Sequence, residues 1–402
     1  MSLFFWKKDV SSLTKSLHQL LHEVAPVLPI DLDRDDDETD ADDATPLSPD
    51  VADTSTTGAP PPSTSEVVDV LDVDATARVE RLLVKIRHVV CGTPDEPIQT
   101  DECLQVVDML LRYQVVERLV HPDLLVQVSF EAQKSVAAII KAMVHQHTAA
   151  TRPVVCQVSF LTRLCQGYAC PTTEVALVSG SMLRDVLDTS VDAISLFLAK
   201  MPAEFRQLVA VASTHAHFEI SSDALTNISC LLTQHTPELE AECDRLFTEY
   251  QLLLTSTNYA TQRHALQILS KVLLDPRNGA VMMSYISNKT HLKHIMQLLR
   301  EQSDALRMDA FHVFKIFVAN PSKAPDIEAL LLRNRDKLLK FVVEFGADHT
   351  EAYPTLAAEI RLLVFTLEKL APAATTDTAP APSPDDDAAL PPQKQQKLVI
   401  DT

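Results

Sequence analysis

Between Thr76 and Leu370, apolar residues recur at spacings of three and four positions, which is the period of an amphipathic α-helix. The pattern predicts helices over residues 78–90, 131–145, 258–274 and 290–299, each with a polar face opposite the apolar one. No stretch shows the sustained alternation with a period of two that a half-buried strand requires. The hydrophobic pattern therefore predicts an all-α protein.

The segment 304–320 differs from the others because apolar residues cover most of its circumference. Its apolar positions form two adjacent stripes, one of Phe311, Phe314 and Val318 and one of Ala310, Val313 and Phe317. A helix of this kind has to be buried between neighbouring helices. We expect it to be a central helix of a late repeat, where Phe314→Ala would cost about 3–5 kcal/mol.

Helix boundaries are indicated by Asp275-Pro276, by Asn320-Pro321, and by Gly346, which we place before the last helix. Short helices with short connections over residues 76–370 suggest stacked helical pairs or triplets. A repeat of about 40–47 residues is typical of armadillo and HEAT arrays, and six or seven such units would fit. We therefore predict an armadillo/HEAT-like, right-handed helical-repeat solenoid in the form of a horseshoe.

The remaining parts of the chain lack this pattern. Residues 1–30 carry a predicted helix over 12–24, with Leu13, Leu17, Leu20 and Leu21 on one face. Residues 31–75 form an acidic, Pro-, Ser- and Thr-containing insert with a net charge of −14, and residues 371–402 form a tail with a net charge of −3. Neither segment holds enough apolar surface to offset the entropy of ordering the chain, so both are predicted to be disordered.

Charge and composition exclude several classes of protein. The total net charge of −20 lies almost entirely in the insert and the tail, and the nearly neutral repeat domain lacks the basic patch that a nucleic-acid partner would require. The six glycines are too widely spaced for a nucleotide-binding loop. The odd number of cysteines, seven, with no C-x-x-C pair, is typical of reduced thiols in a cytoplasmic protein. No apolar run approaches the roughly 18 residues of a membrane span, so no membrane association is expected.

Candidate chemistry is sparse. Asp31, Asp33 and Asp35 begin like a calcium loop, but the sixth position holds Asp36 where the loop requires glycine, and a solvated charge run is the favoured interpretation. Histidines are paired at 145 and 147, at 215 and 217, and at 291 and 294, with no motif that supplies a third metal ligand. Ser179-Gly180-Ser181 does not form a nucleophile elbow. We expect no metal, no cofactor and no enzymatic activity.

Several segments resemble the calcium-binding protein 39 (Mo-twenty-five) family. These segments are F-F-W-K-K (4–8), G-Y (167–168), E-V-A-L-V-S-G-S-M-L-R-D (174–185), F-E-I-S-S-D-A (218–224), D-R-L-F-T-E-Y (244–250), N-Y-A-T-Q-R-H-A-L (258–266), Y-I-S (285–287), L-K-H-I-M-Q-L-L-R (292–300) and A-F-H-V-F-K-I-F-V-A-N-P-S-K (310–323). The resemblance covers roughly residues 76–345 and implies an armadillo-like horseshoe. It also implies a non-catalytic scaffold that holds STE20-type kinases, or the STRAD pseudokinase with liver kinase B, in an active conformation. Such a scaffold is expected to act as a monomer within hetero-complexes, in signalling and in cell polarity or morphogenesis.

The resemblance implies a kinase-binding concave face. Phe218, Tyr259 and Arg263 match family residues on this face, and Gln267 stands where the family usually has lysine. Tyr259, Arg263 and Gln267 are spaced four residues apart. This spacing independently places them opposite or beside the apolar stripe of their helix, so they should project from the array of helices. Tyr and Arg are also enriched among binding hot spots. Spacing alone favours a merely solvated face, and the resemblance favours the binding face.

A second site, a C-terminal pocket that takes a Trp-Glu-Phe tail, is also implied by the resemblance. Met296 and Arg333 match positions of this pocket, with Arg333 in place of a family lysine. Met296 also belongs to the apolar stripe of its own helix, so a core role is equally open. Pro276 and Gly279 stand where the family has an arginine and a phenylalanine, which leaves open whether the tail is recognised in the same way.

The alternative function from another class is a peptide-binding adaptor of the importin or phosphatase-subunit type. Such adaptors bind linear peptides in grooves rich in asparagine and tryptophan. Trp6 is the single tryptophan of this chain, which disfavours a groove of that kind.

Overall fold

The computed structural model of the protein describes residues 10–24, 73–93, 97–349 and 355–370. Within these ranges every regular element is a helix and none is a strand, which confirms the all-α prediction. Most of the predicted acidic insert, the whole predicted tail and the candidate calcium loop lie outside the described residues. The described helices divide into two compact units, residues 1–154 with 169–182 and residues 155–168 with 183–402.

The first unit is built around α2 and α6. Its helices are α1 (Val10–Val24), α2 (Val73–Cys91), α3 (Thr100–Arg112), α4 (Val115–Leu119), α5 (Pro122–Gln127), α6 (Phe130–Gln146), α7 (Thr148–Val155) and the part of α9 (Thr173–Thr189) up to Met182. α2 packs against α1, α3 and α6. It begins at Val73, inside the range predicted as insert, because Ala75 is buried together with Val79 and so extends the apolar stripe by one turn.

The second unit holds the remaining helices. They are α8 (Val158–Gln166), η1 (Gly167–Ala169), the end of α9, α10 (Val191–Lys200), α11 (Pro202–Thr214), α12 (Phe218–Thr233), α13 (Pro237–Ala241), α14 (Cys243–Leu254), α15 (Tyr259–Leu274), η2 (Pro276–Asn278), α16 (Gly279–Ser287), α17 (Lys289–Leu298), α18 (Asp304–Ala319), α19 (Pro325–Arg333), α20 (Arg335–His349) and α21 (Leu356–Glu368). In this unit α15 ends at Leu274, and α18 ends just before Asn320-Pro321, as those stop signals predict.

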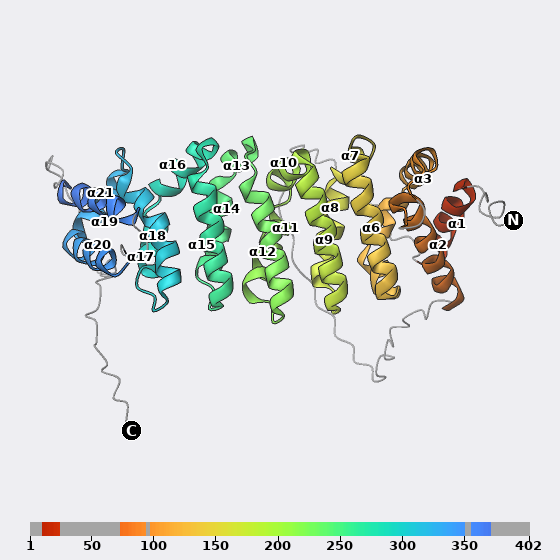
Figure 1. The fold of residues 1–402 in the computed structure, drawn as a ribbon, viewed down its shortest axis with the longest axis horizontal. Coiled ribbons are helices and arrows are strands. Elements are labelled where there is room, and N and C mark those ends of the chain that lie inside the picture. The colour runs from red at the N-terminus through yellow and green to blue at the C-terminus, as the bar shows by residue number, and fades with distance from the viewer. Residues whose placement is uncertain (1–9, 25–72, 94–96, 350–354, 371–402) are drawn as a thin grey trace, which may run out of the picture. The chain divides into compact units, whose positions relative to one another are not determined.

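A helical repeat organises this second unit. α12 packs against α15, α15 against α18, and α18 against α21, so these four helices form one layer, which we call the α12–α21 layer. Each helix of the layer also packs against the helix of its own repeat, namely α11, α14, α17 and α20 in that order. Figure 1 shows α12, α15 and α18 side by side. Successive helices of the layer begin 41, 45 and 52 residues apart, which confirms the armadillo-like repeat, with the last interval longer than predicted.

The core of the second unit follows the predicted stripes. All six apolar residues predicted for the two stripes of α18 are fully buried. Phe311 stacks on Phe345 of α20 with ring centroids 4.7 Å apart, and Phe317 contacts Tyr285 of α16 at 6.0 Å. α18 is therefore held between several helices, as its circumferential hydrophobicity predicts.

The prediction for Gly346 is wrong. This glycine lies inside α20, and the last helix begins only at Leu356. A Cβ atom at position 346 would stand 3.1 Å from Cγ2 of Ile360 in α21. The glycine therefore allows α20 and α21 to approach closely, and it does not end a helix.

Candidate partner-binding surface

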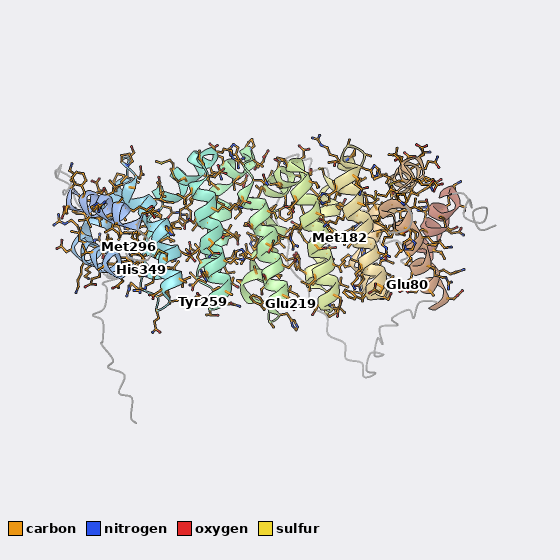
Figure 2. All side chains as sticks on the ribbon, viewed as in Figure 1. Glu80, Met182, Glu219, Tyr259, Met296 and His349 are labelled. Carbon is orange, nitrogen blue, oxygen red and sulfur yellow. The ribbon has the colours of Figure 1, made fainter. Side chains whose placement is uncertain are left out.

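Two large aromatic side chains stand exposed where helices of the α12–α21 layer begin. Phe218 is the first residue of α12 and is 60% exposed, while Tyr259 is the first residue of α15 and is 48% exposed. α15 starts at Tyr259 because the side chain of Asn258 accepts hydrogen bonds from the backbone N–H groups of the first turn. Figure 2 places Tyr259 and Glu219, the neighbour of Phe218, at the same edge of the layer.

The solvent-facing side of α15 carries the three residues that were predicted to project from this helix. The apolar positions of this helix are buried: Ala265, Leu266, Ile268, Leu269, Val272 and Leu273. Tyr259, Arg263 and Gln267 occupy the opposite side, where Gln267 is exposed and the side chain of Arg263 is 42% exposed. The projection of all three side chains therefore agrees with their spacing.

Asp309 of α18 is a polar residue of this surface that the sequence analysis did not single out. Its Oδ2 accepts hydrogen bonds from Nε of Arg263 at 3.1 Å and from Nε2 of Gln267 at 3.2 Å. The hydrogen bond to Asp309 raises the pKa of the Arg263 guanidinium. One signal was available in the sequence, since Asp309 is the single carboxylate of α18 after its first turn. We call Tyr259, Arg263, Gln267 and Asp309, together with Phe218, the candidate surface.

A polar cluster joins η1, α9 and α12 in the same unit, and its members Tyr168 and Asn227 are buried. Asp223 of α12 accepts hydrogen bonds from the Tyr168 hydroxyl and from the Arg184 guanidinium of α9. Asn227, one turn further along α12, donates to the Tyr168 oxygen at 2.7 Å. Burial raises the pKa of Tyr168, and the neighbouring Asp223 carboxylate adds to the increase. Three of the sequence segments that carry the family resemblance thus meet in one hydrogen-bonded cluster that joins η1, α9 and α12.

Comparison with known proteins gives a family match over most of the chain. The sequence model of the family described as Mo25-like matches residues 64–371. The chain belongs to the Mo25-like family. This membership confirms the resemblance inferred from the motifs.

Relatives of this Mo25-like chain come from several kingdoms. A human protein named calcium-binding protein 39-like is 32% identical over 285 residues, which cover 69% of this chain and 82% of the relative. The Mo25-like protein of Schizosaccharomyces pombe is 32% identical over 282 residues, covering 67% and 82% respectively. The conidiophore development protein hymA of Emericella nidulans is 27% identical over 310 residues, covering 67% and 78%.

Solved structures with some likeness include repeat proteins made by design. A designed armadillo repeat protein in complex with the peptide (KR)4 is 12% identical, with a TM-score of 0.39, over 60% of this chain and 93% of that one. An engineered protein is 14% identical, with a TM-score of 0.45, over 74% and 71%. The fold assignment rests on the helices described above.

The two residues predicted for the C-terminal pocket lie on different helices of the Mo25-like chain. Met296 of α17 is half-buried, beside the buried Leu292 and Ile295. Arg333 ends α19 and is exposed. It lines a hollow of about 330 Å³ whose other lining residues are Leu332, Arg335, Asp336 and Lys337. Met296 does not line this hollow, so the two residues do not share it.

The loop that departs from the family pattern forms η2 and the start of α16. Asp275 caps η2 by accepting from the backbone N–H of Arg277, and the Arg277 hydrogen bonds hold the pKa of the Asp275 carboxyl at about 2. A Cβ atom at Gly279 would meet no atom within 4 Å, so this position faces open space. A methyl group would therefore fit there without displacing any neighbour.

Several of the paired histidines have structural partners. Nδ1 of His215 accepts from the backbone N–H of His217 at 3.1 Å in the turn before α12. His291 is buried and stacks on Tyr285 with ring centroids 4.1 Å apart. Among the residues that the structure describes, no group of three or more His, Cys, Asp or Glu side chains is placed to hold a metal ion. Within the same residues, no helix combines the length and apolar character needed to cross a membrane.

Proposed function

We propose that this Mo25-like protein is a non-catalytic cytoplasmic scaffold that binds STE20-type protein kinases, or a pseudokinase–kinase complex, and activates the bound kinase allosterically. Family membership supports an adaptor of helical repeats. The single observation that carries the proposal is the exposure of Phe218, Tyr259 and Arg263 on adjacent helices of one layer. Aromatic and arginine side chains are the residue types that dominate binding energy at protein interfaces.

The proposed activation needs no catalytic group on the scaffold. A scaffold that binds the active conformation of a kinase more tightly than the inactive one shifts the kinase population by that difference in affinity. A tenfold preference corresponds to about 1.4 kcal/mol. The α12–α21 layer suits this role because it presents its exposed side chains from helices that pack against one another and against their own repeat partners.

The test compares Arg263 with an arginine in a similar setting elsewhere in the same unit. Arg206 of α11 is 63% exposed and forms an ion pair with Glu249 of α14, as Arg263 does with Asp309, but it lies outside the α12–α21 layer. Wild type, Arg263→Ala and Arg206→Ala would each be used to capture a panel of purified STE20-type kinase domains, and the kinase activity of each mixture would be measured. The thermal melt of each variant would be recorded in parallel.

We expect the wild type and Arg206→Ala to bind and stimulate a kinase of the panel, and Arg263→Ala to lose most of both effects without a change in its melt. Equal binding by the two variants would refute the candidate surface. ATP hydrolysis by the purified protein without any kinase would refute the non-catalytic assignment.

A further inference from the structure

The Asp309 carboxylate holds two side chains of α15 with a single oxygen. Oδ2 accepts from Nε of Arg263 and from Nε2 of Gln267, and the Asp309 side chain itself is only 18% exposed. Asp309 comes from α18, the next helix of the layer, so these contacts cross between two repeats. A second contact joins the hydroxyl group of Ser303, the residue that caps α18, to the hydroxyl group of Tyr259 in α15 at 3.4 Å.

The chemistry of a carboxylate fixes which atoms face outward. An ionised carboxylate only accepts hydrogen bonds, so Gln267 has to turn its NH₂ group toward Asp309. The Gln267 carbonyl oxygen is then directed away from Asp309. Arg263 contacts Asp309 through Nε alone, which leaves the outer Nη edge of its guanidinium unused by that carboxylate.

We infer that Asp309 is a positioning residue of the candidate surface, which fixes Arg263 as an outward donor and Gln267 as an outward acceptor. This inference rests on the proposed function. Residues four apart on a helix lie about 5–6 Å from one another, so the surface presents a donor and an acceptor one helical turn apart. The matching partner is a protein surface that offers a carbonyl or carboxylate opposite Arg263 and an N–H or O–H donor opposite Gln267.

The benefit of Asp309 to binding is preorganisation. Long polar side chains lose rotamer freedom when a partner immobilises them, and a side chain that is already held loses less. The usual size of this loss for one such side chain predicts that removal of the Asp309 carboxylate weakens partner binding about three- to tenfold. If the hydrogen bonds of Asp309 only stabilised the packing of α15 on α18, their loss would not change Kd in this way once the protein is folded.

A double-mutant cycle tests the positioning role. Kd for a STE20-type kinase domain that the wild type binds would be measured for Asp309→Ala, Arg263→Ala and the double variant, with a thermal melt of each. Glu249→Ala, which breaks the equivalent pair with Arg206, is the matched control. We expect Asp309→Ala to raise Kd about three- to tenfold. When Arg263 is already alanine, Asp309→Ala should raise Kd by a smaller factor, because only Gln267 then remains to be positioned. Glu249→Ala should leave Kd within about twofold.

The outcomes of the cycle separate the inference from the proposed function. An increase in Kd for Arg263→Ala with no increase for Asp309→Ala would overturn the positioning role and leave the candidate surface intact. Fully additive effects would show that Asp309 does not act through Arg263, which also overturns it. An unchanged Kd for Arg263→Ala would overturn the candidate surface, and the role of Asp309 with it. Asp309→Leu, which has a similar size but accepts no hydrogen bond, replaces the alanine variant if the latter lowers the melting temperature.

Gln267→Lys tests the predicted acceptor. A lysine ammonium could still pair with Asp309, but it offers only donors to a partner. We expect this variant to raise Kd at least about threefold, because the partner donor opposite position 267 would lose its acceptor and face a positive charge. An unchanged or lower Kd would overturn the assignment of Gln267 as an outward acceptor.

Discussion

Alanine substitution of two phenylalanines in the second unit should affect different properties: stability for Phe314 and partner binding for Phe218. Phe314 lies in α18 with no exposed surface, whereas Phe218 begins α12 and is 60% exposed. Phe314→Ala removes most of a side chain that is surrounded by other helices and leaves a cavity that a close-packed core only partly closes. Phe218→Ala removes a side chain that mostly contacts solvent.

The expected magnitudes differ several-fold. Phe314→Ala should lower the free energy of unfolding by about 3–5 kcal/mol, the usual range for a fully buried phenylalanine. A unit of this size loses about 2–4 °C in melting temperature per kcal/mol, so the expected decrease is about 6–20 °C. Phe218→Ala should change stability by no more than about 0.5 kcal/mol, but it should weaken capture of the kinase partner.

Thermal and urea unfolding, followed by circular dichroism and by intrinsic fluorescence, would measure both variants. Two probes are needed because helical-repeat proteins can unfold one part at a time, and a single midpoint is meaningful only where the two transitions coincide. Kinase capture at a temperature well below both transitions supplies the second measurement. Similar melts for the two variants, or a loss of stability with Phe218→Ala alone, would refute the placement of α18 at the centre of the repeats.

Three further predictions concern other positions of the second unit. Burial lowers the pKa of His291 below its ordinary value near 6.5, so the unfolded chain binds the proton more readily. The contribution of neutral His291 to stability should be fully present above about pH 6.5 and should decrease as the pH falls below that value. Urea midpoints measured between about pH 5 and 7.5 should therefore depend less steeply on pH for His291→Gln than for the wild type. Asp223→Asn should destabilise the unit by about 1–3 kcal/mol, because Arg184 keeps its charge without a charged partner; a urea midpoint equal to the wild type would contradict this. Gly346→Val should cost about 1–3 kcal/mol by pressing on Ile360, and Ile360→Ala should recover part of the loss in thermal melts if the crowding is the cause.

The fold was predictable from the sequence to a large extent because its helices are amphipathic and their buried stripes are long. The two stripes of α18 and the stripe of α15 are buried as predicted. The prediction that Gly346 marks a helix boundary was wrong because a glycine near the end of a helical pattern usually marks the terminus of the helix. Here its small size serves contact with α21, and such a contact depends on a neighbour that periodicity along one helix cannot reveal.

The candidate surface was predictable only in part. The outward projection of Tyr259, Arg263 and Gln267 follows from their spacing on one helix. The role of Asp309 does not, since its partners lie more than 40 residues away in the chain and the pairing depends on how α15 packs on α18. The same reason applies to Met296, whose helix is predictable but whose separation from the hollow beside Arg333 is a property of the packing of α17 and α19.

The polar cluster around Asp223 has a consequence for how members of this family can diverge. Segments that identify the chain as Mo25-like include Tyr168, Arg184 and Asp223, and these residues join η1 and α9 to α12. They are spatially distinct from the outward side chains of α15. A descendant could therefore acquire a new binding specificity through a few outward substitutions while its recognisable motifs stayed the same, so shared motifs alone would not imply a shared client.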